Sequence, residues 1–169
     1  MRLSLLFIAA GFLVVLLQTT VLHLLPLGRF VPDLALVLCV YLGLNHPTVG
    51  AVLGSFILGY SVDVFSAGGV LGLNAFAFSL VFLAVYVSSR AIWVHSPLSS
   101  APVVFFASWI KVAALQGVWT LFLAMEGLGA GALKYTLVDA ILAAVLAPGI
   151  FSLLKRGQSY LEEVRMPVL

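Results

Sequence analysis

Charged residues are scarce in this sequence. Only 8% of its 169 residues are Asp, Glu, Lys or Arg, against about 25% in an ordinary soluble domain. A soluble fold of this length cannot hydrate its surface with so few charges. The basic residues are also dispersed, which argues against a nucleic-acid-binding surface. Cys39 is the only cysteine, so an internal disulfide and a cysteine metal site are excluded, and we expect a packed thiol.

Recognisable catalytic patterns are lacking as well. The three histidines, His23, His46 and His95, lie far apart in the chain and near different ends of apolar stretches, so a shared metal site is not expected. No Ser, Cys or Asp has the setting of an activated nucleophile. The Gly-rich segment at 66–74 is not followed by the GK[ST] of a phosphate-binding loop. We therefore expect no enzymatic activity, no cofactor and no metal.

Long apolar stretches dominate what is present, since 63% of the residues are hydrophobic. A membrane-spanning helix needs about 20 apolar residues, so six such helices with tight turns use the whole chain. We predict an all-α polytopic integral membrane protein, a compact bundle of about six transmembrane helices. It forms a single domain over residues 1–169, with a short cytoplasmic tail from about 157. The predicted spans are 3–25, 31–44, 48–66, 73–93, 101–125 and 134–154. The second is short, which indicates either less tilt or partial covering by its neighbours.

The distribution of basic residues predicts the orientation. With both termini cytoplasmic, five Lys or Arg side chains lie inside and two outside, as the positive-inside rule favours. The inner residues are Arg2, Arg90, Lys155, Arg156 and Arg165, and the outer ones are Arg29 and Lys134. In this orientation Asp33, Asp63, Glu126 and Asp139 gather towards the outer end of the bundle.

Asp63, Lys111 and Asp139 are the informative polar residues, because a charge at membrane depth is costly and normally faces a partner inside the bundle. The helical rise places Asp63 and Lys111 within reach of each other if their helices are neighbours. We interpret them as a structural pair rather than a proton or substrate site, since no relay of further carboxylates or histidines accompanies them. Asp139 either joins this cluster or makes an interhelical hydrogen bond in its protonated form.

Glycines mark the third stretch and the turn after it. Gly50 and Gly54 form a GxxxG pair, and with Gly59 they indicate an internal packing face where another helix comes close; a homodimer seam is the alternative. In the following turn, three glycines permit positive φ angles: Gly68, Gly69 and Gly72. Asn74 is placed to cap the fourth helix.

Two segments resemble the family of bacterial rod shape-determining proteins MreD. One is Val31-Pro32-Asp33 with the apolar run through Tyr41 to Leu44. The other is GAVLGSFILGYSVDVFSAGGVLGLN, residues 50–74: a Gly-rich helix, an Asp near its end, a Gly-rich turn and then Gly-Leu-Asn. The resemblance covers about 45 residues clearly, and the remainder agrees in hydropathy and span count.

The resemblance implies a non-enzymatic subunit of the cell-elongation machinery in the bacterial inner membrane. Its implied partners are the bitopic protein MreC and, through it, the MreB filament and the peptidoglycan synthases RodA and a class B penicillin-binding protein. It also implies a bundle similar to the substrate-binding subunit of energy-coupling-factor transporters. A small-solute binding subunit of a transporter, with the outer acids as its pocket, is therefore the alternative. Our candidates for a partner surface are Pro32, Asp33 and Tyr41 on the short second stretch.

Overall fold

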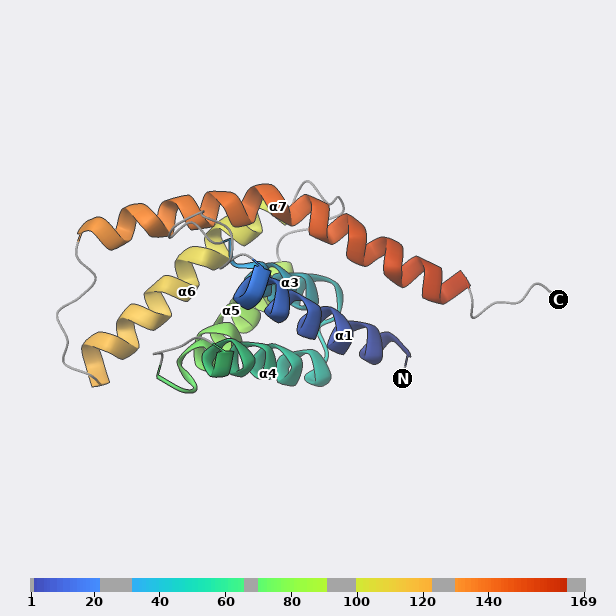
Figure 1. Ribbon diagram of the computed structural model, residues 1–169, viewed down its shortest axis with the longest axis horizontal. Coiled ribbons are helices and arrows are strands. Elements are labelled where there is room, and N and C mark those ends of the chain that lie inside the picture. Colours follow the sequence, from blue (N-terminus) through green and yellow to red (C-terminus); the bar gives the residue numbers. More distant parts are fainter. Residues whose placement is uncertain (1, 22–31, 66–69, 91–99, 123–129, 164–169) are drawn as a thin grey trace.

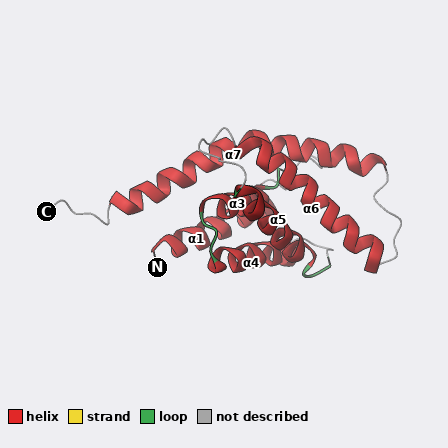
Figure 2. Ribbon diagram, turned by 180° about the vertical axis from the view of Figure 1, so that it is seen from behind, coloured by secondary structure: helices red, strands yellow, loops and turns green. Residues whose placement is uncertain are grey.

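The computed structural model describes residues 2–21, 32–65, 70–90, 100–122 and 130–163. The regular elements in these ranges are helices (Figures 1 and 2). They are α1 (Arg2–Leu16), continued by the π-helical turn η1 (Leu17–Val21), α3 (Leu34–Asn45), α4 (Val49–Phe65), α5 (Leu73–Ser89), α6 (Ser100–Phe122) and α7 (Ala130–Glu163). Each of the six apolar stretches thus contains one α-helix, and the prediction of an all-helical fold is confirmed.

Two of these helices are long and apolar enough to cross a membrane by themselves, namely α6 and α7 within Ser100–Leu121 and Leu137–Tyr160. The four other apolar helices are 10–17 residues long in the described part of the chain, shorter than the roughly 20 apolar residues that a full crossing takes. Chain length and composition therefore support membrane insertion most directly for the α6–α7 pair.

The short helix α3 forms the core of the bundle. Residues 35–41 are at most 1% exposed, and α3 contacts α1, α4, α5, α6 and α7. Figure 2 shows it among the other helices. The residues of α3 are apolar on all of its faces, which is the pattern of a helix that is buried all round. Of the two alternatives for the short second stretch, covering by neighbouring helices is the one observed.

The last helix is longer than the sequence indicated. It was expected to end near Leu154, but α7 continues to Glu163. Pro148 lies inside it, and α7 changes direction along its length (Figure 1). A proline removes one helical hydrogen bond and bends the helix without ending it here. Residues 155–163 are therefore helical.

Candidate functional site

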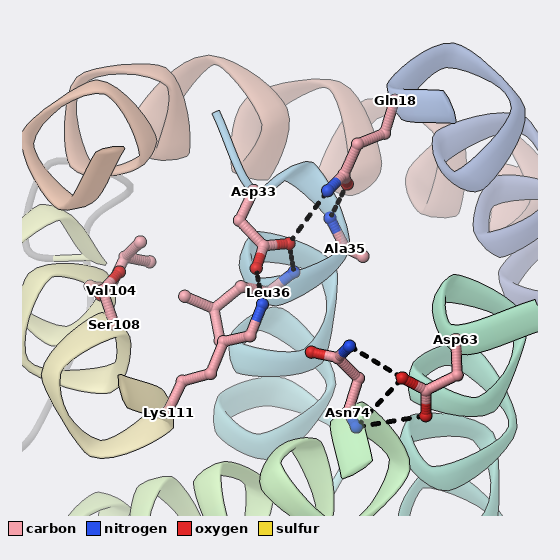
Figure 3. A network of polar contacts seen from close by, with 9 residues as sticks. All are labelled: Gln18, Asp33, Ala35, Leu36, Asp63, Asn74, Val104, Ser108 and Lys111. Carbon is pink, nitrogen blue, oxygen red and sulfur yellow. Dashed lines mark hydrogen bonds and ion pairs between the residues drawn. The ribbon is translucent and has the colours of Figure 1, made fainter. Parts of the chain in front are cut away.

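Asp63, near the end of α4, caps the start of α5. Its carboxylate accepts hydrogen bonds from the backbone N–H groups of Gly72 (3.0 Å), Asn74 (3.1 Å) and Ala75 (3.3 Å), and from the Asn74 side chain (2.7 Å). The side chain is 3% exposed. The first N–H groups of a helix lack partners within the helix and carry its positive dipole end, so a carboxylate is the favoured acceptor. Figure 3 shows the contacts between Asp63 and Asn74.

The role expected for Asn74 is therefore wrong. The N-cap of α5 is Gly72, without a side-chain capping bond of its own, and Asn74 lies in the first turn, where its amide binds Asp63. Gly72 has φ of +92°, the left-handed conformation that glycine adopts most readily. Because Gly72 turns the chain sharply, the N–H groups of the next residues point at α4. Gly68 and Gly69, also expected in this turn, lie outside the described residues.

The close contact between α4 and α5 is at Gly59. A Cβ atom there would lie 2.6 Å from the Asn74 carbonyl oxygen, 2.6 Å from Phe78 Cδ2 and 2.7 Å from Ala75 Cα, all shorter than van der Waals contact. Of the three glycines expected on a packing face, Gly59 alone lies at such a crossing. This close approach brings the Asp63 carboxylate, one helical turn further on, against the start of α5.

The expected internal packing by the GxxxG pair is wrong. A Cβ on Gly54 would have no neighbour within 4 Å, and one on Gly50 would meet only the Thr48 hydroxyl at 3.9 Å. Both residues are on a face of α4 that no described helix covers closely. Spacing alone marks a possible close contact, while the rotation of α4 decides which of its glycines faces a neighbour.

Lys111 pairs with Asp33, not with Asp63 as the sequence led us to expect. The Lys111 ammonium, from α6, forms an ion pair with Asp33 at the start of α3, and it lies 4.9 Å from the centre of the Phe78 ring. Both side chains of the pair are 16% exposed. The physical reason is that Asp63 is already saturated by the start of α5, whereas Asp33 faces α6 across the core. The pair links α3 to α6.

Asp33 also organises the start of its own helix. It is the N-cap of α3 and accepts a hydrogen bond from Leu36 N–H at 3.0 Å. Gln18, in the π-helical turn after α1, accepts from Ala35 N–H at 3.2 Å and reaches towards Asp33 with its amide nitrogen at 3.5 Å (Figure 3). Gln18 was not among the residues predicted from the sequence, although an amide within an apolar stretch was a signal, since such a group must find partners inside the bundle.

Asp139 lies on α7, the second of the two long apolar helices. Its Oδ1 atom is buried and has no hydrogen-bond partner among the described residues. Both alternatives for Asp139 stay predictions, and the ionic partner of Lys111 is Asp33.

Residues expected at a partner surface are instead in the interior. Tyr41 is 0% exposed, Pro32 is buried, and Asp33 is engaged by Lys111. The Tyr41 ring packs on Phe151 of α7, with ring centres 5.0 Å apart, and its hydroxyl donates to the Gln158 side chain at 3.2 Å. A short apolar helix that is covered on all sides cannot present these side chains to another protein.

These polar groups act as structural links between helices. The carboxylates of Asp33 and Asp63 accept bonds from protein donors, and the Lys111 ammonium has an acidic and an aromatic partner. Within the described ranges, no group of three or more His, Cys, Asp or Glu side chains is placed to hold a metal ion. The arrangement is suited to fixing helix positions in an environment where water cannot satisfy polar groups.

Large apolar side chains cover the outside of the helices, including Phe12, Ile57, Leu83, Phe106 and Val145, while Lys111 and Asp33 form an ion pair within the bundle. Together with the two long apolar helices, these features define a small helical integral membrane protein. A family model described as rod shape-determining protein MreD matches residues 1–156. The chain therefore belongs to the MreD family, which confirms the resemblance found in the sequence. Searches of the curated proteins and of the solved structures found no match.

Proposed function

We propose that this protein is a non-enzymatic subunit of the cell-elongation machinery in the bacterial inner membrane, with both termini cytoplasmic. It maintains rod shape by binding MreC and, through it, MreB and the peptidoglycan synthases RodA and a class B penicillin-binding protein. The observation that carries this proposal is the match to the MreD family over residues 1–156. The five-to-two bias of basic residues supports the orientation.

The internal polar contacts favour this proposal over the transporter alternative. A solute pocket at the outer acids needs carboxylates that are free to bind a ligand. Asp63 is instead occupied by four protein donor contacts at the start of α5, and Asp33 by Lys111. Both carboxylates are thus committed to holding the bundle together.

The contact with a partner lies on the outer helix surfaces, since α3 is covered. Association between helices in lipid depends on close packing and interhelical polar contacts, and the exposed faces of α1, α4, α5, α6 and α7 are available for it. A photoreactive amino acid placed at one exposed position on each helix identifies the face that is used. Suitable positions are Leu13, Ile57, Val87, Phe106 and Val145.

The test combines these photoreactive variants with deletion of the gene in a rod-shaped host. Rounded cells in the null strain, rescue by each variant, and cross-linking of MreC from one helix face are the expected results. A variant with the photoreactive group at the buried Val37 is the matched control, and it should not cross-link another protein. Rod shape retained in the null strain, together with lost uptake of one small solute, would instead support the transporter function.

A further inference from the structure

A groove of about 480 Å³ lies on the outer surface between the start of α4 and the face of α5 that runs from Phe76 to Tyr86. Its lining is mainly apolar, with Val52, Phe76 and Leu83 each 41–55% exposed. The hydroxyl-bearing residues Thr48, Ser79 and Tyr86 also line it. A volume in the range of about 300–1,000 Å³ is typical of small-molecule sites, and an apolar lining that faces lipid suits a hydrocarbon chain.

Arg90 stands at one end of this groove. Its guanidinium donates a hydrogen bond to the hydroxyl of Tyr86, a lining residue, and its central carbon lies 5.0 Å from the centre of the Tyr86 ring. Lys111 with Asp33 is the one ion pair found among the described residues. Arg90 therefore has no carboxylate partner among those residues. Between residues 34 and 90 of the sequence, Asp63 is the only acidic residue. The guanidinium is therefore available to bind an anion.

The arrangement of apolar groove and cation matches an amphiphile with a negative head. Along α5, Phe76 and Tyr86 are ten residues apart, which corresponds to about 15 Å of helix. Arg90 follows one turn later, just after α5 ends at Ser89, the depth at which lipid headgroups lie when α5 is inserted. An arginine fork binds phosphate with charge-assisted hydrogen bonds, and basic positions between membrane helices bind anionic headgroups.

We propose that this groove binds one anionic glycerophospholipid, with an acyl chain along α4 and α5 and its phosphate on Arg90. An apolar helix from a partner would fill the groove but would leave the Arg90 charge without a counter-ion, so the lipid is the better fit. The inference is independent of the partner proteins proposed above.

The experiment measures lipid binding to the purified full-length protein by native mass spectrometry, with phosphatidylglycerol and phosphatidylcholine as probes. For the wild type, we expect binding of phosphatidylglycerol to be tighter by about tenfold or more, the scale of one charge-assisted contact. Arg90→Gln should abolish this preference and leave phosphatidylcholine binding unchanged. Leu83→Trp, at an exposed lining position, should weaken binding of both lipids. Arg156→Gln, at an exposed cation on α7, is the matched control and should behave as the wild type.

Equal binding of the two lipids by the wild type, or a preference that survives Arg90→Gln, would overturn the proposal. A photoreactive group at position 83 provides a second measurement in native membranes. Its attachment to phospholipid supports the proposal, whereas its attachment to another protein without phospholipid would show that a partner occupies the groove.

Discussion

Gly59 provides the sharpest test of the packing between α4 and α5. Gly59→Ala adds one methyl group at a site where two of the three contacted atoms, the Asn74 carbonyl oxygen and Ala75 Cα, belong to the backbone and cannot rotate away. Overpacking of this kind costs about 1–3 kcal/mol, and rigid backbone neighbours place Gly59→Ala at the upper end. Gly54→Ala on the same helix adds the same methyl group, but it meets nothing within 4 Å and should be neutral or slightly stabilising.

Thermal unfolding in one detergent, followed by size-exclusion chromatography or tryptophan fluorescence, compares the two variants with the wild type. A loss of about 3 kcal/mol in a chain of this length lowers the Tm by roughly 6–12 °C, so Gly59→Ala should melt well below Gly54→Ala. Adding Phe78→Leu to Gly59→Ala should restore little of the loss, because the backbone contacts remain. Equal melting temperatures for Gly59→Ala and Gly54→Ala would refute the close crossing, and full recovery with Phe78→Leu would refute the argument from rigid backbone atoms.

Three further predictions concern the polar links and the orientation. Asp63→Ala leaves the N–H groups at the start of α5 without an acceptor and should lower the free energy of unfolding by about 1–3 kcal/mol. Asp63→Asn keeps one acceptor oxygen and should lower it by less. Equal losses for the two variants in chemical denaturation would contradict this capping role. Lys111→Met leaves the Asp33 carboxylate without its cation and should lower the free energy of unfolding by about 3–5 kcal/mol. Addition of Asp33→Asn should recover part of this loss, whereas the losses from Lys111→Met and Asp63→Ala should be additive. Double-mutant cycles measure both relationships. A cysteine introduced after residue 163 should react with an impermeant maleimide only after the membrane is opened. Background labelling should be small because Cys39 is buried. Labelling of intact cells would show an external C-terminus.

The position of the helices followed from hydropathy and turn residues. Each apolar stretch holds one helix because an apolar segment satisfies its own backbone hydrogen bonds in that conformation. Helix ends were less predictable. Pro148 lies well inside α7, and the polar residues after Leu154 continue the helix, since Gln158 is held by the Tyr41 hydroxyl and by His46.

The pairing of polar side chains was predicted only in part. Burial of Asp63 near the turn follows from the cost of a charge in lipid, and a turn rich in glycine offered backbone donors. The choice between Asp33 and Asp63 as the partner of Lys111 could not be made from the chain order. Helical rise pointed to Asp63, but the lateral order of the helices decides which acid faces α6, and that acid is Asp33.

By itself, the sequence determined that the chain is helical, that it belongs in a membrane, and that its few intramembrane charges must find partners. These outcomes depend on composition and on the transfer cost of apolar and charged groups, which do not require knowledge of neighbours. Tertiary structure decided that α3 is the covered centre, that Gly59 rather than Gly54 faces a helix, and that Asp33 receives Lys111. Those outcomes depend on the rotation and lateral placement of each helix. Lipid solvates every apolar helix face equally well, so only the sum of packing and polar contacts determines the rotation and placement.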